Sequence, residues 1–192
     1  MPCTVDPGPG DALIVVDVQQ DFLPDGALGV ADGDAVVPVL NEWIQRFEAA
    51  GLPVVFSRDW HPANHCSFEA QGGIWPPHCV AGSQGAEFAD ALRLPEGALI
   101  VSKATGAGEE AYSAFDGTNL SGMLARQGVK RVFVGGLATD YCVKATVEDA
   151  LGEGLGVLVI ADAIRSVDVK AGDGDRALES MRAGGAGVLA NG

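Results

Sequence analysis

Short apolar runs alternate with helical patterns along this chain, and that alternation restricts the fold more than any other feature. Residues 12–16 are apolar without interruption, as is typical of a central strand buried on both faces of a parallel sheet. Further strands are predicted at residues 53–57, 98–102, 132–134, 156–160 and 186–189. Helical spacing and helix-ending signals predict helices at residues 36–47, 86–92, 120–125, 140–151 and 174–183. The sequence therefore predicts an α/β fold with a doubly wound, mostly parallel six-stranded sheet and helices on both faces.

Length and composition limit the class of protein. The 192 residues, 47% of them hydrophobic, suffice for one full core, and no linker or repeat divides them. We expect a single domain over residues 1–192 with a flexible N-terminus at residues 1–10. No run of 18 apolar residues or signal-peptide core occurs, so no membrane partner and a cytoplasmic location are expected. The net charge of −14 argues against nucleic acid as a partner.

The four cysteines form no C-x-x-C pair, which argues against a zinc ribbon or a thioredoxin-like motif. A disulfide between Cys66 and Cys79 is one option, but free thiols are expected in a reducing compartment. Cys142 stands apart because of its position. Gly135 and Gly136 are expected to end the fourth strand, and helical spacing begins near residues 140–142. The thiol then lies in the first turn of a helix, where backbone N–H groups and the helix dipole lower a cysteine pKa. An ordinary buried cysteine is the alternative interpretation.

Residues with chemical roles follow the three earlier strands as well. Asp17 follows the first strand, Asp59 and His61 the second, and Lys103 the third. In a doubly wound sheet, ligands bind at the carboxyl ends of the strands, so these side chains are expected near Cys142. Taken singly, the two aspartates can be turn or cap residues and Lys103 a solvated charge. Their joint placement favours a functional site.

The set of Cys142, Asp17 and Lys103 is sufficient for nucleophilic acyl transfer. Asp17 can accept the thiol proton, and the ammonium of Lys103 favours both anions. Backbone N–H groups near Ala138 and Cys142 would form the oxyanion hole.

Asp59 and His61 also predict a metal site. Residues two apart in an extended segment point to the same side, and His78, in a Trp-Pro-Pro-His sequence, is the candidate third ligand. Two histidines and one carboxylate suit one divalent ion, Zn²⁺ first, or Fe²⁺ or Mn²⁺. His65 is expected to position its loop by hydrogen bonds rather than to bind the metal.

Four motifs together resemble the nicotinamidases of the isochorismatase-like cysteine hydrolases. They are DVQQDF at 17–22, DWHPANH at 59–65, WPPHCV at 75–80 and GLATDYCV at 136–143. The resemblance extends over residues 12–190. It implies hydrolysis of nicotinamide to nicotinate and ammonia through a cysteine thioester, acceptance of pyrazinamide, and a role in NAD salvage.

The same resemblance implies roles for single residues. Cys142 matches the nucleophile, Asp17 the base and Lys103 the supporting lysine. The metal, held by the residues matching Asp59, His61 and His78, would bind the pyridine nitrogen of the substrate.

The resemblance also implies a cis peptide bond in the segment Leu137-Ala138 and aromatic pocket walls. The walls match Phe22, Trp75 and Tyr112, although plain core packing explains Phe22 and Tyr112 equally well. A further metal contact by His65 or Gln71 stays open, and the glycine-rich segment 103–110 matches no assigned feature.

Three alternatives remain. Relatives that hydrolyse carbamoylated amines or ureido compounds share the Cys–Asp–Lys set but lack the metal site, while true isochorismatases lack the cysteine. A thiol sensor or binding module could use the same fold without catalysis. A sensor would usually have a resolving cysteine near Cys142, and none is close in sequence. The sequence leaves open whether the chain forms a homo-oligomer.

Overall fold

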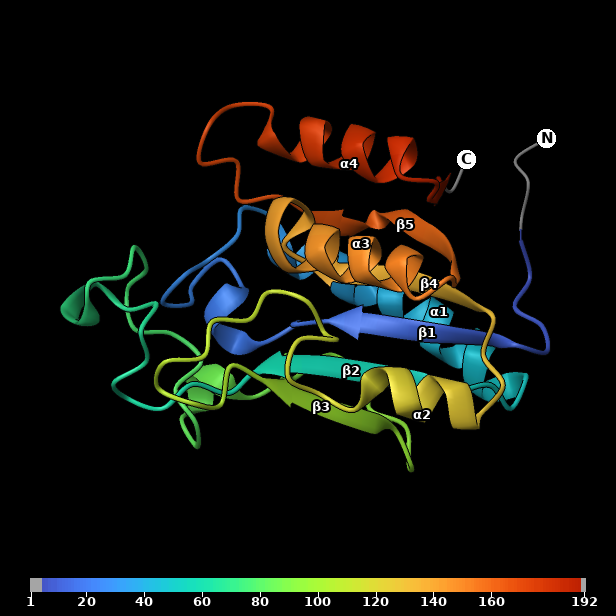
Figure 1. The fold of residues 1–192 in the computed structure, drawn as a ribbon, viewed down its shortest axis with the longest axis horizontal. Helices are drawn as coiled ribbons and strands as arrows, with labels where there is room; N and C mark the ends of the chain where they lie inside the picture. Colours follow the sequence, from blue (N-terminus) through green and yellow to red (C-terminus); the bar gives the residue numbers. More distant parts are fainter. Residues whose placement is uncertain (1–4, 191–192) are drawn as a thin grey trace.

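The computed structural model describes residues 5–190, which form a layered α/β fold around one six-stranded sheet (Figure 1). The strands are β1 (Asp11–Val16), β2 (Val54–Asp59), β3 (Leu99–Lys103), β4 (Arg131–Leu137), β5 (Gly156–Arg165) and β6 (Gly187–Leu189). Every pairing is parallel, and the strand order is β3-β2-β1-β4-β5-β6. The chain therefore starts at the centre of the sheet and winds to both edges, which confirms the predicted fold class.

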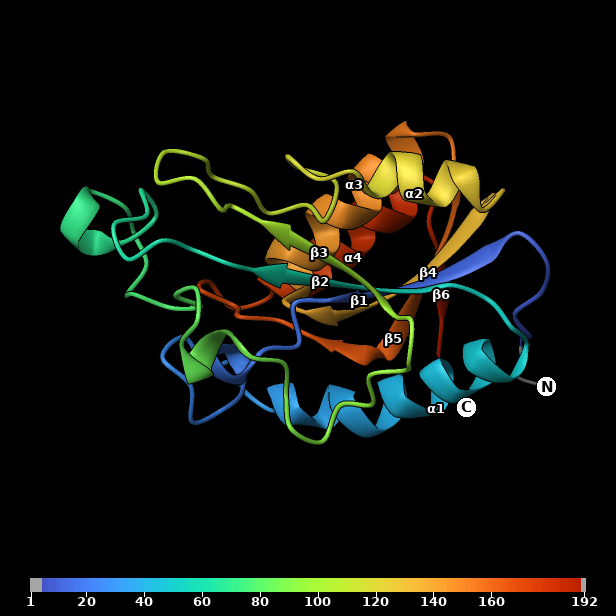
Figure 2. The same cartoon turned by 90° about the horizontal axis from the view of Figure 1, so that it is seen from below.

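Helices cover both faces of the sheet (Figure 2). Helix α1 (Val36–Ala49) lies on one face, and α2 (Leu120–Arg126), α3 (Lys144–Gly152) and α4 (Asp173–Ala183) lie on the other. Strand β1 supplies both cores, because Leu13 and Val15 pack on the α1 side while Ile14 and Val16 pack on the opposite side. This two-sided burial explains the unbroken apolar run in the sequence.

The prediction that Gly135 and Gly136 end the fourth strand is wrong, because β4 continues to Leu137. Gly136 has φ +128°, and a Cβ atom there would lie 2.1 Å from the carbonyl oxygen of Val16. The glycine thus permits a close approach between β4 and β1. The register against β5 also shifts between Val134 and Gly136, as in a β-bulge.

The short helix predicted at residues 86–92 is wrong as well. The structure has only a short 3-10 helix, Gln84–Ala86, at this point. The backbone instead bonds to the loop after β1: the N–H of Gln20 donates to the carbonyl of Glu87, and the N–H of Ala89 donates to that of Val18. These long-range bonds replace the local bonds of a helix.

The predicted helix that begins near residues 140–142 is confirmed with a small change. A π-helical turn, Thr139–Val143, precedes α3 and places Cys142 in the first helical turn. Cys66, Cys79 and Cys142 are free thiols, while Cys3 and residues 1–4 of the expected flexible segment lie outside the described residues. Among residues 5–190, no helix has the length and apolar character needed to cross a membrane.

Candidate active site

Lys103 lies where the carboxyl ends of β1 to β4 meet, and it contacts three of the predicted site residues. Its Nζ atom is 2.9 Å from Oδ2 of Asp17 and 3.5 Å from Sγ of Cys142, and it also pairs with Oδ1 of Asp59. All four side chains are buried. One buried ammonium thus joins the predicted nucleophile, the predicted base and one predicted metal ligand.

Asp17 directly follows β1 in the left-handed backbone region, with φ +48°. This conformation is costly for a residue with a side chain and is concentrated at functional sites. Its Oδ1 atom accepts a hydrogen bond of 2.6 Å from the hydroxyl of Ser57. Its Oδ2 atom is near Lys103, yet no hydrogen-bond donor of the described chain is aligned with it. Because Sγ of Cys142 lies within 4.8 Å of a carboxylate oxygen of Asp17, this carboxylate is placed to accept the thiol proton.

Burial controls the protonation of this pair. It raises the pKa of the Cys142 thiol well above its ordinary value. The charge of Lys103 lowers this pKa, while the negative charges of Asp17 and Asp59 raise it further. The expectation that the helix start lowers this pKa is therefore wrong, because desolvation and two carboxylates outweigh it. Burial also raises the pKa of Asp17, although Lys103 opposes the shift. Both shifts favour the neutral forms of these groups, and a carboxylate with a raised pKa is a stronger base than an exposed aspartate.

Asp59, His61 and His78 form a second buried group, in which one ligand atom of each lies within 4.8 Å of the others. Nδ1 of His61 is 3.1 Å from the carbonyl oxygen of Ala104, and Nδ1 of His78 is 2.8 Å from that of Pro76. If each Nδ1–H donates to its carbonyl, the Nε2 lone pairs are left for a metal ion.

The pKa shifts of Asp59 and His78 also suit a bound cation. Burial lowers the pKa of His78, which favours the neutral imidazole that a metal requires. Burial alone would raise the pKa of Asp59, but the charge of Lys103 holds it well below its usual range. One carboxylate and two imidazoles form a ligand set that fits a divalent ion such as Zn²⁺.

His65 and Gln71 do not supply a further free ligand. The ring of His65 stacks on His61 with centroids 4.1 Å apart. Its Nδ1 is 2.7 Å from the hydroxyl of Ser67 and its Nε2 is 2.8 Å from the carbonyl oxygen of Glu109, so both nitrogens have protein partners. Gln71 is exposed. The geometry therefore favours a positioning role for His65.

The glycine-rich segment 103–110, for which the sequence indicated no role, holds the histidine loop through its backbone. The carbonyl of Ala104 faces His61, that of Ala107 accepts the N–H of Cys66 at 2.7 Å, and that of Glu109 contacts His65. Backbone carbonyls have no sequence signature, which is why this role was missed.

Gln19 is another positioning residue that the sequence did not reveal. Its fully buried amide donates to the carbonyls of Asp59 at 2.8 Å and Ala86 at 2.9 Å, and accepts the N–H of Asp59 at 2.8 Å. Two of these bonds fix the end of β2, where Asp59 enters the site, and the third ties the loop at Ala86 to the same amide.

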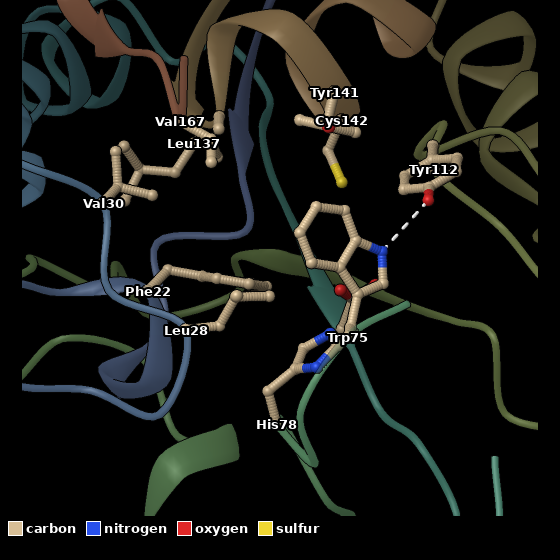
Figure 3. A pocket seen from close by; sticks show the side chains of 12 residues that line it. Phe22, Leu28, Val30, Trp75, His78, Tyr112, Leu137, Tyr141, Cys142 and Val167 are labelled. Atoms are coloured by element: carbon tan, nitrogen blue, oxygen red, sulfur yellow. Dashed lines mark hydrogen bonds between the residues drawn. The ribbon is translucent and has the colours of Figure 1, made fainter. Parts of the chain in front are cut away.

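A cavity beside Cys142 joins the two groups (Figure 3). The three predicted aromatic residues line it, and Nε1 of Trp75 donates a hydrogen bond of 3.2 Å to the hydroxyl of Tyr112. Ala138 lines it too, and its peptide bond with Leu137 is cis, as the resemblance implied. The sequence did not single out the remaining apolar and aromatic wall, which consists of Leu28, Val30, Leu137, Tyr141 and Val167.

Comparisons with known proteins agree with this geometry. The family model "Isochorismatase domain" matches residues 11–191. The nicotinamidase of Escherichia coli strain K12 is 39% identical over 199 residues, which cover 93% of each chain. The crystal structure of the pyrazinamidase of Pyrococcus horikoshii in complex with zinc matches with a TM-score of 0.91 and 49% identity, over 95% of this chain and 100% of that one. A Leishmania structure, PnC1 from L. infantum in complex with nicotinate, matches with a TM-score of 0.90 and 35% identity, over 98% and 96% of the two chains.

Proposed function

The chain belongs to the isochorismatase family, and from this premise we propose that it hydrolyses nicotinamide to nicotinate and ammonia, and accepts pyrazinamide. The enzyme class predicted from the sequence is confirmed by the similar nicotinamidases. The observation that carries the proposal is the arrangement around Lys103. A thiol, a carboxylate base and an Asp–His–His group share this lysine, and Asp59, His78 and Cys142 line one aromatic cavity.

In the proposed reaction, Asp17 removes the proton of the Cys142 thiol, and the thiolate attacks the amide carbon to form a C–S bond. The backbone N–H groups of Ala138 and Cys142 hold the oxyanion. Asp17 then returns the proton to the amide nitrogen, because an amine must be protonated to leave. The C–N bond breaks, ammonia departs and a thioester remains.

Hydrolysis of the thioester uses the same groups. Asp17 removes a proton from water, the resulting hydroxide attacks the thioester carbon, and the C–S bond breaks. Asp17 then reprotonates the departing thiolate of Cys142, and the acid product is released. Lys103 stabilises the anionic forms of both residues throughout, since its ammonium lies within reach of each.

Asp59, His61 and His78 would hold one divalent metal ion, for which zinc is the first candidate and iron or manganese the alternatives. When bound, the ion would supply a Lewis-acid contact for the pyridine nitrogen of the substrate. Phe22, Trp75 and Tyr112 would hold the ring of the substrate. This metal group favours nicotinamide over the carbamoyl and ureido substrates of metal-free relatives.

The remaining context follows from the family. We place the reaction in NAD salvage and the protein in the cytoplasm. The three free thiols of the described chain agree with a reducing compartment.

The proposal is tested by ammonia release from nicotinamide. We expect zinc-loaded wild type to be active, Cys142→Ala to lose at least about 10³-fold in kcat, and chelation to lower activity until zinc is restored. Cys66→Ala, which removes a different free thiol, is the matched control and should stay active. No ammonia from zinc-loaded wild type would refute nicotinamide as substrate, and activity insensitive to complete metal removal would refute the metal role.

A further inference from the structure

Asp140 joins the turn that carries Cys142 to a distant segment of the chain. Its Oδ1 atom accepts the backbone N–H of Val167, and its Oδ2 atom accepts that of Asp168, each at 2.9 Å. Asp140 lies in the π-helical turn Thr139–Val143, while its two partners lie between β5 and α4. Bonds to a carboxylate are stronger than bonds between neutral groups, so this is a firm double link.

The linked segment forms part of the pocket wall. Val167 lines the cavity that contains Cys142. Figure 3 shows Val167 beside Leu137 at the apolar end of the cavity, away from Tyr112. The position of Val167 therefore affects how much room a bound ring has.

The segment also has hydrogen bonds of its own. Asp168, with φ +53°, accepts the N–H of Gly174 at 2.8 Å through Oδ1 and the hydroxyl of Ser166 at 2.8 Å through Oδ2. A Cβ atom at Gly174 would lie 2.4 Å from Oγ of Ser166, so the contact between these residues requires glycine. These bonds tie Ser166, Asp168 and Gly174 together, and Asp140 attaches this segment to the turn that carries Cys142.

We propose that Asp140 is a positioning residue that sets the width of the pocket and thereby selects flat heteroaromatic amides without bulky ring substituents. Only the choice of substrate rests on the proposed function. Asp140 touches neither the reacting atoms nor the ring. It acts through Val167, whose side chain forms part of the pocket wall.

The test compares Asp140→Asn with the matched control Asp149→Asn, which removes the same charge from an exposed site on α3. Asparagine keeps one acceptor but points an amide N–H₂ at the second backbone N–H, so one of the two bonds is lost. We expect KM for nicotinamide to rise about tenfold in Asp140→Asn, with kcat changed less than about threefold, because a displaced wall weakens binding throughout the reaction. The kcat/KM of a ring-methylated nicotinamide, relative to nicotinamide, should rise about tenfold. Asp149→Asn should match wild type in each value.

Amide hydrogen exchange supplies a readout that does not depend on turnover. Residues 166–173 should exchange faster in Asp140→Asn than in wild type or Asp149→Asn. Val167→Ala, which keeps the backbone bond, should shift selectivity in the same direction without faster exchange. Unchanged exchange together with unchanged KM would refute the proposal, as would a loss confined to kcat. If wild type fails to hydrolyse nicotinamide, the proposed function is refuted, while the exchange experiment still tests the link itself.

Discussion

Lys103 is fully buried, and its charge is balanced by residues from neighbouring strands. Burial alone would lower the pKa of its ammonium, but Asp17 and Asp59 raise it well above its ordinary value. An ion taken out of water needs such partners, and removal of one partner leaves an uncompensated charge. While its carboxylate partners are ionised, the lysine therefore stabilises folding up to a pH of about 10.5, and this contribution is lost as pH rises through the higher folded pKa. The same residue holds Asp17, the proposed base, and Asp59, the candidate metal ligand, in one place.

Ser57 lowers the pKa of Asp17, the proposed base. Its hydroxyl donates to Asp17 and stabilises the ionised carboxylate, which lowers the pKa that burial has raised. In Ser57→Ala this pKa rises further, so the acid limb of kcat/KM against pH should move to higher pH, while the plateau falls less than about tenfold. Ser102→Ala, which removes a hydroxyl bonded to Arg58, should leave the limb in place. A limb unmoved by Ser57→Ala would show that another group controls it.

Gln19 should affect the affinity of the candidate site for a metal ion rather than the reactivity of the Cys142 thiol. Gln19→Met keeps the size of the side chain but removes all three bonds to the backbone of Asp59 and Ala86. Loss of such support for a ligand lowers metal affinity about 10–100-fold. Competition with a chromogenic chelator measures this directly. The control is the adjacent Gln20→Met, because within the described residues the Gln20 amide makes a single side-chain hydrogen bond, 3.4 Å long, to the carbonyl of Phe88. Equal zinc affinity in the two variants would contradict the assignment.

At the scale of elements, Gly136 decides whether β4 can lie against β1. Gly136→Ala would place a methyl group 2.1 Å from the carbonyl of Val16 in a left-handed conformation, and should reduce the free energy of unfolding by at least about 3 kcal/mol. Gly152→Ala makes the same change in α3, where no other part of the described chain, apart from the adjacent residues and the helix's own backbone, lies within 4 Å of the new carbon, and should stabilise by about 0.5–1 kcal/mol. Urea unfolding measures both, and similar midpoints would show that β4 can move away.

The elements also show how far the sequence alone could lead. Strands with two buried faces, such as β1, are predictable because their apolar runs have no other explanation. The four strand ends with Asp17, Asp59, Lys103 and Cys142 followed from this topology. Gly136 misled the prediction because close packing of two strands and the end of a strand both call for glycine. The carbonyl of Ala104 and the wall at Val167 could not be predicted, since their roles depend on loop paths.

At the scale of the whole molecule, the net charge of −14 favours expansion of the chain. Added salt screens this repulsion, so we expect Tm to rise by a few degrees between about 10 mM and 200 mM sodium chloride. Nicotinamide is uncharged, so its kcat/KM should change less than about twofold over the same range. Parallel salt titrations of stability and rate test this separation. A strong salt dependence of the rate would indicate that surface charge acts on the site.

The strand order has a consequence for the chain while it is being synthesised. Of the six strands, β1 leaves the ribosome first. It can soon pair with β2, but its other edge has no partner until β4 has been synthesised. The pairing of Asp11 with Arg131 spans 120 residues, or about 6–24 s of translation at about 5–20 residues per second. During that interval an apolar strand presents an open edge of the kind that recruits other chains. Nascent chains that end before β4 should therefore be the form of this protein most dependent on chaperones.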